Sequence, residues 1–236
     1  MRSNRRATAG PRDWYTDADF DNSMDDLRAR CGEGVFERGR GVDVDLVLQR
    51  GYDIGPDFVV LPAGVLGRTT FFPDGKLHME VSRALADAAE HSVVGRRRLR
   101  STLAHECGHV VFHRHHFVTE GQGSLFGSGS EHAPGNVLCR EDAVDDRLRR
   151  RDGREYQANR GMASLLLPNR LVRAELADVL KIAGFETLRD AVAAGDGETV
   201  LRGVGEVFDV SFEMTLYRVR ELQLLPKDGN QSEFGW

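Results

Sequence analysis

Cysteine is scarce in this chain, and long apolar runs are missing. The three cysteines, Cys31, Cys107 and Cys139, are odd in number, and none of them form a CxxC pair. This argues against a disulfide framework and against a cysteine-rich zinc finger, and it fits a reducing compartment. The basic N-terminal stretch is not followed by an apolar segment, and no run is long enough to span a bilayer. We therefore expect a cytoplasmic protein.

Lysine and an excess of positive charge are also lacking. The basic residues are nearly all arginine, and the net charge is −5. An acidic chain is not expected to be a general nucleic-acid binder, so the arginine runs at 96–100 and 149–151 are interpreted as solvated faces. Hydrophobic residues make up 40% and charged residues 29%, as in ordinary soluble globular proteins.

The order of patterns along the chain predicts three parts. Residues 1–20 are polar and are expected to form a flexible arm. Residues 21–168 are expected to form the main domain, in which the runs DFVVLP, RTTFF and LHMEV, separated by turn signals, predict a small antiparallel sheet between about 57 and 82. Residues 169–236 are expected to form a helical C-terminal subdomain. Within the main domain, residues 118–150 are rich in glycine, serine and charge, and are predicted to be a long loop insert.

An HExxH motif lies in the strongest predicted helix, RRRLRSTLAHECGHVVFHRHH. His105 and His109 are one helical turn apart on the same face, so both rings can bind one Zn²⁺. Glu106 lies about 100° further round the helix, where it can reach a metal-activated water and act as general base without being a ligand. Gly108 is interpreted either as room for a close approach over the metal or as a site of tight helix packing.

A catalytic zinc site needs a third protein ligand and an open position. Glu155 and Asn159 share one face of the predicted helix EYQANRGMASLLL, so Glu155 is the candidate ligand and Asn159 the residue that orients a ligand histidine. His113 is the alternative ligand, but three successive turns of one straight helix do not easily converge on one ion. We therefore interpret His113 as a packing or orienting residue.

The residue that would stabilise the oxyanion is not selected by the sequence. His78 in the predicted sheet, His132 in the insert and Tyr156 beside Glu155 all remain candidates. His115 and His116 are expected to be solvated.

The two motifs together resemble the ImmA/IrrE metallopeptidases, regulatory zinc proteases of bacteria and their mobile elements. The resemblance rests on RSTLAHECGHVVFH and EYQANRGMASLLLP, and is supported by the preceding sheet and the late VFDVS and LYRVRELQLL segments. It covers about residues 40 to 225. Two features depart from the family pattern: Cys107 stands where an aliphatic residue is usual, and the separation between His109 and Glu155 is long.

The resemblance implies a zincin-like α+β fold with a small antiparallel sheet, an HExxH active-site helix, a second helix bearing the glutamate and a helical C-terminal part. It also implies a zinc endopeptidase that holds one Zn²⁺ per chain and cleaves a helix-turn-helix transcriptional repressor, in stress response or mobile-element control. We expect the substrate to add a strand to a sheet edge, for which LHMEV is the candidate.

Two further hypotheses concern the rest of the chain. The segment VGEVFDVSFEMTLYRVRELQLL is expected to form a helix-turn-helix-like unit, so the alternative function is a metal-binding regulator that acts through these helices without proteolysis. Its mixed charge favours a protein partner over DNA. The insert 118–150 is expected to cover the cleft as a lid, with an incidental Cys139 or, as a sharper alternative, a Cys139 thiolate that blocks the open zinc position.

Overall fold

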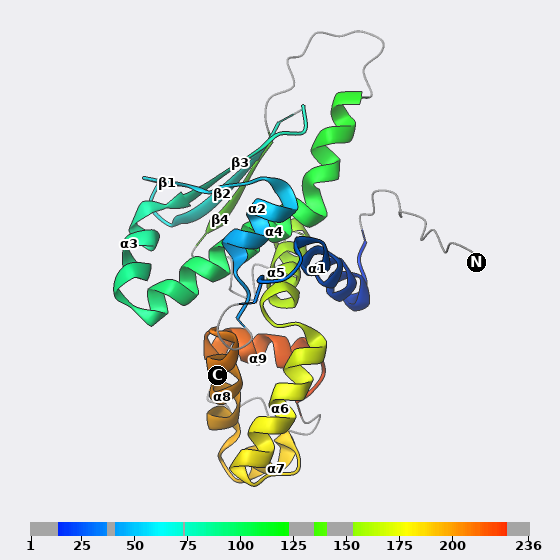
Figure 1. Ribbon diagram of the computed structural model, residues 1–236, viewed down its shortest axis with the longest axis vertical. Coiled ribbons are helices and arrows are strands. Elements are labelled where there is room, and N and C mark those ends of the chain that lie inside the picture. The colour runs from blue at the N-terminus through cyan, green and yellow to red at the C-terminus, as the bar shows by residue number, and fades with distance from the viewer. Residues whose placement is uncertain (1–13, 37–40, 73, 123–134, 141–152, 226–236) are drawn as a thin grey trace, which may run out of the picture.

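The computed structural model describes residues 14–36, 41–72, 74–122, 135–140 and 153–225, and they form an α+β molecule (Figure 1). Among these residues no helix is both long and apolar enough to cross a membrane. The helices are α1 (Asp17–Cys31), α2 (Val44–Tyr52), α3 (Arg83–His91), α4 (Val93–Gln122), α5 (Gly153–Leu166), α6 (Asn169–Ala183), α7 (Leu188–Ala193), α8 (Gly197–Phe208) and α9 (Phe212–Glu221), and the strands are β1 (Asp57–Val59), β2 (Val65–Phe71), β3 (Leu77–Ser82) and β4 (Gly135–Arg140).

The sheet is mixed, with strand order β1-β3-β2-β4. The prediction of a purely antiparallel sheet is wrong at one pairing, because β1 lies parallel to β3. The chain reverses direction between β1 and β2 and again between β2 and β3, so β1 and β3 run the same way. Since β1 docks beside β3 and not beside β2, the pairing is parallel. The predicted turn before β3 is present, and its Gly75 has the left-handed φ of 83°.

Strand β3 is an interior strand. It pairs with β1 on one side and with β2 on the other. The prediction that its segment LHMEV forms a sheet edge is therefore wrong at Glu80 and Val81, which pair with β1, whereas residues 77–79 lie beyond the end of β1 on that side. In the part of the chain that the structure describes, the edges are β1 and β4.

The insert between the two motif helices is not a loop throughout. Helix α4 continues to Gln122, and residues 135–140 form β4, which pairs antiparallel with β2. Composition alone predicted a loop because glycine and serine have low strand propensity, whereas the pairing with β2 is a long-range interaction. Residues 123–134 and 141–152 lie outside the described residues, so the predicted lid stays a prediction.

The N-terminal arm ends earlier than predicted. Helix α1 begins at Asp17, because Thr16 and Asp19 form a capping box in which each side chain bonds the other's backbone. Residues 17–20 are therefore helical, and Phe20 is fully buried against Phe112 of α4. Residues 1–13 lie outside the described part of the chain.

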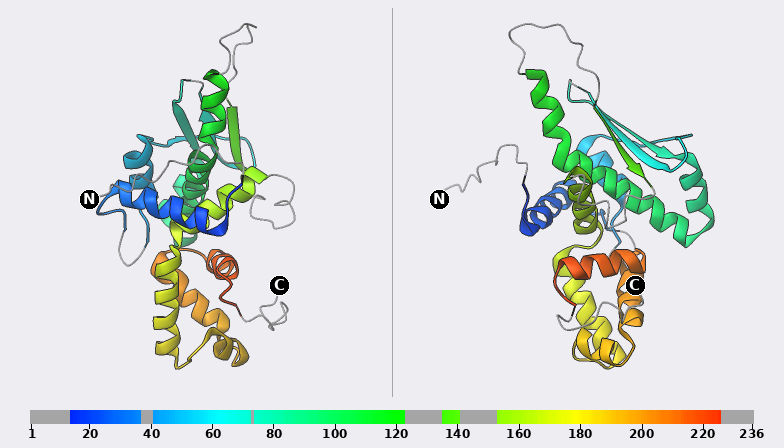
Figure 2. Two further views of the ribbon diagram at one scale, coloured as in Figure 1. Left: turned by 90° about the vertical axis from the view of Figure 1, so that its right-hand side faces the viewer. Right: turned by 180° about the vertical axis from the view of Figure 1, so that it is seen from behind.

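Helix α4 runs beneath the sheet, and α5 crosses it on the opposite side from the strands (Figures 1 and 2). Alternate residues of β2 face α4, since strand side chains alternate between faces. The Phe71 ring stacks on Phe117 of α4 with 4.5 Å between the ring centroids. The central part of α4 is thus enclosed between β2 and α5.

Helices α6 to α9 form a lobe beyond α5 (Figure 2). They do not have a separate core, because a single cluster of buried hydrophobic residues extends from α1 through α4 and α5 into α6, α8 and α9. The predicted turn between the last two helices is present: α8 ends at Phe208 and α9 begins at Phe212. The C-terminal lobe is thus packed against the motif helices.

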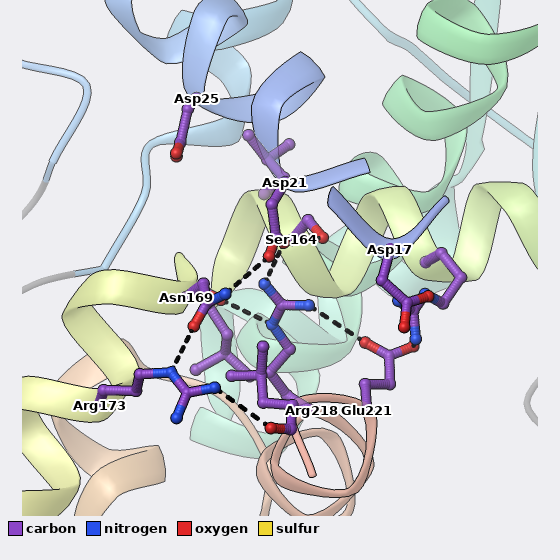
Figure 3. A network of polar contacts seen from close by, with 12 residues as sticks. Asp17, Asp21, Asp25, Ser164, Asn169, Arg173, Arg218 and Glu221 are labelled. Atoms are coloured by element: carbon purple, nitrogen blue, oxygen red, sulfur yellow. Dashed lines mark hydrogen bonds and ion pairs between the residues drawn. The ribbon is translucent and has the colours of Figure 1, made fainter. Parts of the chain in front are cut away.

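A buried polar network ties this lobe to α1 and α5 (Figure 3). The Arg218 side chain on α9 is 1% exposed, donates to the Leu167 carbonyl at 2.9 Å and forms an ion pair with Asp21 of α1. Asp21 also accepts from Ser164 at 2.7 Å and from Asn169 at 3.0 Å. Burial opposes the charge on Asp21, but Arg218 outweighs it and lowers the pKa of the carboxyl. Because a buried charge without its partner is costly, this network fixes α9 in one orientation.

Candidate metal centre

The two motif histidines lie side by side in the enclosed middle of α4. His105 and His109 are 2% and 0% exposed, and their Nε2 atoms are 3.0 Å apart. Their spacing of one helical turn puts both rings on the face that α5 covers. Two imidazole nitrogens therefore converge on one point, as the sequence predicted.

Glu155, in the first turn of α5, faces both histidines. One carboxylate oxygen is 3.1 Å from His105 Nε2 and the other is 3.3 Å from His109 Nε2. A ligand atom from each of these residues lies within 4.8 Å of the other two. In the described residues, His105, His109 and Glu155 are the group that could hold a metal ion. The sequence named the same three.

Two glycines allow α5 to approach α4 this closely. A Cβ atom on Gly108 would lie 2.6 Å from the Ala158 carbonyl oxygen of α5. A Cβ on Gly161 of α5 would lie 2.6 Å from the Phe112 ring and 3.3 Å from the Gly108 Cα. The helices thus cross backbone to backbone at this point. Of the two interpretations of Gly108, the structure supports tight helix packing, and that packing brings Glu155 to the histidines.

Each ligand histidine has a partner at Nδ1, the ring nitrogen that faces away from Glu155. His105 Nδ1 is 3.0 Å from Asn159 Oδ1. Because Nδ1 donates its hydrogen to this oxygen, the other ring nitrogen, Nε2, faces Glu155. His109 Nδ1 is 2.9 Å from His113 Nδ1, and His113 Nε2 is 2.9 Å from Gln157 Oε1. Burial and the neighbouring His109 lower the pKa of His113 to about 3, so His113 is neutral at neutral pH. Asn159 and His113 thus contact the ligand histidines on the side away from Glu155. Gln157, which contacts His113, was not predicted from the sequence.

Glu106 points from α4 toward β2 and is fully buried. The Thr69 hydroxyl donates to Glu106 Oε2 at 2.5 Å, and a Cβ on Gly67 would lie 2.6 Å from Oε1. The carboxylate is therefore held between β2 and the histidine pair, and its charge acts on His105. Sequence reasoning missed Thr69 and Gly67, because nothing in the local pattern links this strand to a helix residue so far along the chain.

Replacement of Gly67 by alanine is expected to displace the Glu106 carboxylate without affecting the metal ligands. A misplacement of about 1 Å at a reacting group costs about 100-fold in rate, and we expect a loss of that order in any hydrolysis that Glu106 supports. Zinc content and cleavage rate should be measured on the same preparation. Gly55→Ala is the matched control, because its Cβ would meet no atom within 4 Å. Unchanged cleavage in Gly67→Ala would contradict this role for β2.

The charges in the site favour a bound cation. Burial opposes ionisation of Glu155, but hydrogen bonds with His105 and His109 outweigh it and lower the pKa of this carboxyl below its ordinary range. Burial also opposes a charge on His105, but the contact with Glu155 outweighs it and raises the pKa of the ring above 6.5. Glu155 is therefore an anion at neutral pH, and its charge favours a cation beside the two histidines.

We expect zinc binding near neutral pH to release a proton. Because the contact with Glu155 raises the pKa of His105, the metal-free ring keeps its proton to a higher pH than an ordinary histidine does, and a metal ligand must be deprotonated. Apparent zinc affinity should then rise with pH until this proton is lost, and level off above the raised pKa. Calorimetry in two buffers of different ionisation enthalpy measures the released proton. Identical heats in both buffers would contradict the expectation.

The three candidates for stabilising the oxyanion, His78, Tyr156 and His132, lie in different surroundings. His78 lies on β3 opposite Thr70, on the face of the sheet away from α4, and its Nε2 is 2.9 Å from Asp57 Oδ2. It is therefore directed away from the metal centre. Tyr156 is 39% exposed, and its ring lies edge-on to Phe20 of α1. His132 lies outside the described residues.

The remaining histidines and cysteines differ partly from expectation. His115 and His116 are half-buried and not solvated as expected. Cys107 is fully buried, and burial raises the pKa of its thiol to about 12. The backbone of Cys139 lies in β4 opposite Gly67, and its side chain lies outside the described part of the structure.

No protein-family model, no curated protein and no solved structure matches this chain. The chemistry of the site is therefore inferred from the geometry above and from the two sequence motifs.

Proposed function

We propose that this protein is a zinc-dependent endopeptidase with a zincin-like fold, in which His105, His109 and Glu155 hold one Zn²⁺. The observation that carries the proposal is the convergence of two imidazole nitrogens and one carboxylate on a single point between α4 and α5. Two nitrogens and one carboxylate are a common set in hydrolytic zinc sites, and they leave one position open. The paired Nε2 atoms and an ionised carboxylate fit a divalent cation.

The residues around the site fit hydrolysis of a peptide bond. Zinc, when bound there, supplies the Lewis acidity that activates water and polarises a carbonyl. Glu106 accepts the proton of the attacking water and passes it to the leaving amine. Thr69 holds the Glu106 carboxylate through its hydroxyl, and Asn159 fixes the ring of His105. Both contacts reduce the motion that the reacting groups must lose in the transition state.

We further propose a regulatory protease of the ImmA/IrrE kind, cleaving a helix-turn-helix repressor in stress response or mobile-element control. The support for this substrate is the motif pair in α4 and α5, together with the C-terminal lobe packed against those helices. The test is to incubate the zinc-loaded protein with a repressor encoded next to it, and with casein. We expect a single cut in the repressor, abolished by a zinc chelator, and little cleavage of casein. Broad degradation of casein would contradict the regulatory role.

The alternative is a regulator that acts through its C-terminal helices without proteolysis. Most of α9 is buried, since Met214, Leu216 and Val219 belong to the core, and its exposed residues are Glu213 and Arg220. The turn before α9 is also engaged, because Asp209 forms ion pairs with Arg96 and Arg97 of α4 at 3.0 and 2.9 Å. These contacts favour a packing role for α9. Full regulatory activity in a His105→Ala protein would favour the alternative.

A further inference from the structure

The two ligand histidines contact α5 by different routes at Nδ1. His105 Nδ1 is 3.0 Å from the side-chain oxygen of Asn159, so its contact with α5 is direct. His109 Nδ1 is 2.9 Å from Nδ1 of His113, which follows it by one helical turn on α4. The other ring nitrogen of His113, Nε2, is 2.9 Å from Gln157 Oε1 on α5. The contact of His109 with the side chains of α5 at this nitrogen therefore passes through a second imidazole.

The hydrogens along this chain of contacts can be placed once His109 is a metal ligand. A neutral imidazole carries one N–H and one lone pair, and a ring nitrogen that binds a metal does so through its lone pair. If Nε2 of His109 is the ligand atom, the hydrogen of this ring is on Nδ1. The two Nδ1 atoms lie at hydrogen-bond distance and share one hydrogen, so Nδ1 of His113 is the acceptor. The hydrogen of His113 is then on Nε2, where Gln157 Oε1 accepts it.

The oxygen of Gln157 favours this order of donors and acceptors. An amide oxygen can only accept a hydrogen bond, and it is the oxygen of Gln157 that faces the ring of His113. It therefore stabilises the tautomer of His113 that has its hydrogen on Nε2. That tautomer accepts at Nδ1, and so it stabilises the tautomer of His109 whose Nε2 lone pair is available to a metal.

Burial makes an incomplete chain of hydrogen bonds costly. His109 and His113 are each 0% exposed, and Gln157 is half-buried. A buried N–H group that loses its acceptor is left with the full cost of its desolvation. Without an acceptor at position 157, the Nε2 hydrogen of His113 would be in this state whenever His109 binds a metal. The bound form of the site would then be destabilised.

We infer that Gln157 is a positioning residue for the metal centre, which acts through His113 and fixes the tautomer of His109. We call this path from Gln157 to His109 the imidazole relay. The inference rests on the proposed function, because the relay is defined by His109 as a zinc ligand. It assigns α5 one amide for each ligand histidine in addition to the ligand Glu155. It also gives the buried His113 a role other than that of a third ligand.

The test combines a double-mutant cycle with a measurement of histidine tautomers. Gln157→Met removes the acceptor and keeps an unbranched side chain of similar length, and His113→Ala removes the intermediate ring. Zinc affinity is measured by chelator competition on wild type, on both single variants and on the double variant. Gln49→Met is the matched control, because Gln49 is an exposed glutamine on α2.

The tautomers are measured on zinc-loaded wild type in which the histidines carry ¹⁵N. Long-range ¹H–¹⁵N correlation spectra show which ring nitrogen of each histidine bears the hydrogen. The signals that are missing from the spectrum of His113→Ala identify those of His113. Because the tautomer is observed in wild type, this measurement tests the relay even where a variant fails to fold.

Gln157→Met is expected to lower zinc affinity by about tenfold or more, as is usual for residues that orient a ligand. In the His113→Ala background the same change should lower it by less than about twofold, because the ring through which Gln157 acts is absent. The spectra should show the hydrogen of His113 on Nε2. Gln49→Met should bind zinc as wild type does.

Two results would overturn the imidazole relay and leave the proposed function standing. One is an equal loss from Gln157→Met with and without His113, which is what a packing role for Gln157 predicts. The other is a hydrogen on Nδ1 of His113 in the zinc-loaded protein. Zinc binding and tautomers as expected, but with no cleavage of the repressor, would overturn the proposed function and leave the relay. A wild-type protein that takes up no zinc would overturn both.

Discussion

Glu106→Gln is expected to abolish peptide-bond cleavage and to leave about one zinc per chain. The substitution removes the proton acceptor, but the glutamine oxygen can still accept the Thr69 hydroxyl at the same place. The ligands His105, His109 and Glu155 are unchanged, so metal binding should persist. General acid–base groups typically contribute about 10²–10⁴-fold to a rate, and the loss should be at least of this order.

Cleavage of the repressor and zinc content should be measured on one preparation of this variant. Glu186→Gln is the matched control, because Glu186 is exposed on the C-terminal lobe. Cleavage by Glu106→Gln at the wild-type rate would contradict the proposed mechanism. Loss of zinc from this variant would show that Glu106 is itself a ligand.

Glu155→Ala is expected to cause the largest loss of zinc affinity among single changes outside α4. It removes one of three ligands and also the negative charge that raises the pKa of His105. The loss should exceed the about 10–100-fold that residues orienting a ligand usually cost. The loss of zinc affinity in Asn159→Ala should fall in that lower range, because Asn159 contacts His105 at Nδ1 and is not a ligand.

A competition titration against a chelator of known affinity gives these values. His113→Ala is the decisive comparison, since His113 is the alternative third ligand and contacts His109 through Nδ1. We expect it to weaken zinc binding less than Glu155→Ala does. If His113→Ala strips the metal while Glu155→Ala retains it, the ligand assignment is wrong.

The ligand group was predictable because it depends on local periodicity. The spacing of His105 and His109 fixes a shared helix face whatever surrounds the helix. The pairing of Glu155 with Asn159 was predictable for the same reason, and both residues face α4 in the structure.

The surroundings of Glu106 were not predictable, because they depend on strand order and register. Short apolar runs indicated strands, but no local pattern places β1 beside β3 or makes β3 an interior strand. The contact from Thr69 to Glu106 follows from the register of β2 over α4, which is a tertiary property. The strand β4 was missed for a related reason, since its partner β2 lies far away in the sequence.

A pocket of 490 Å³ between α4, α5, α8 and α9 was also beyond the reach of local patterns. Its lining residues Ser101, Asn159 and Met214 come from three different helices and carry no shared motif. The turn at Asp209 was predicted, but its ion pairs with Arg96 and Arg97 were not, because those arginines were interpreted as a solvated face. These contacts orient α8 and α9 and thereby build the pocket wall.

The most direct test of the metal centre is a metal analysis combined with X-ray absorption at the zinc edge, on the purified wild-type protein and on His105→Ala with His109→Ala. We predict about one zinc per wild-type chain, coordinated by two imidazole nitrogens and by oxygen, and no bound zinc in the double variant. A wild-type protein that takes up no zinc, or a double variant that keeps it in the same coordination, would contradict the metal centre on which the proposed function depends.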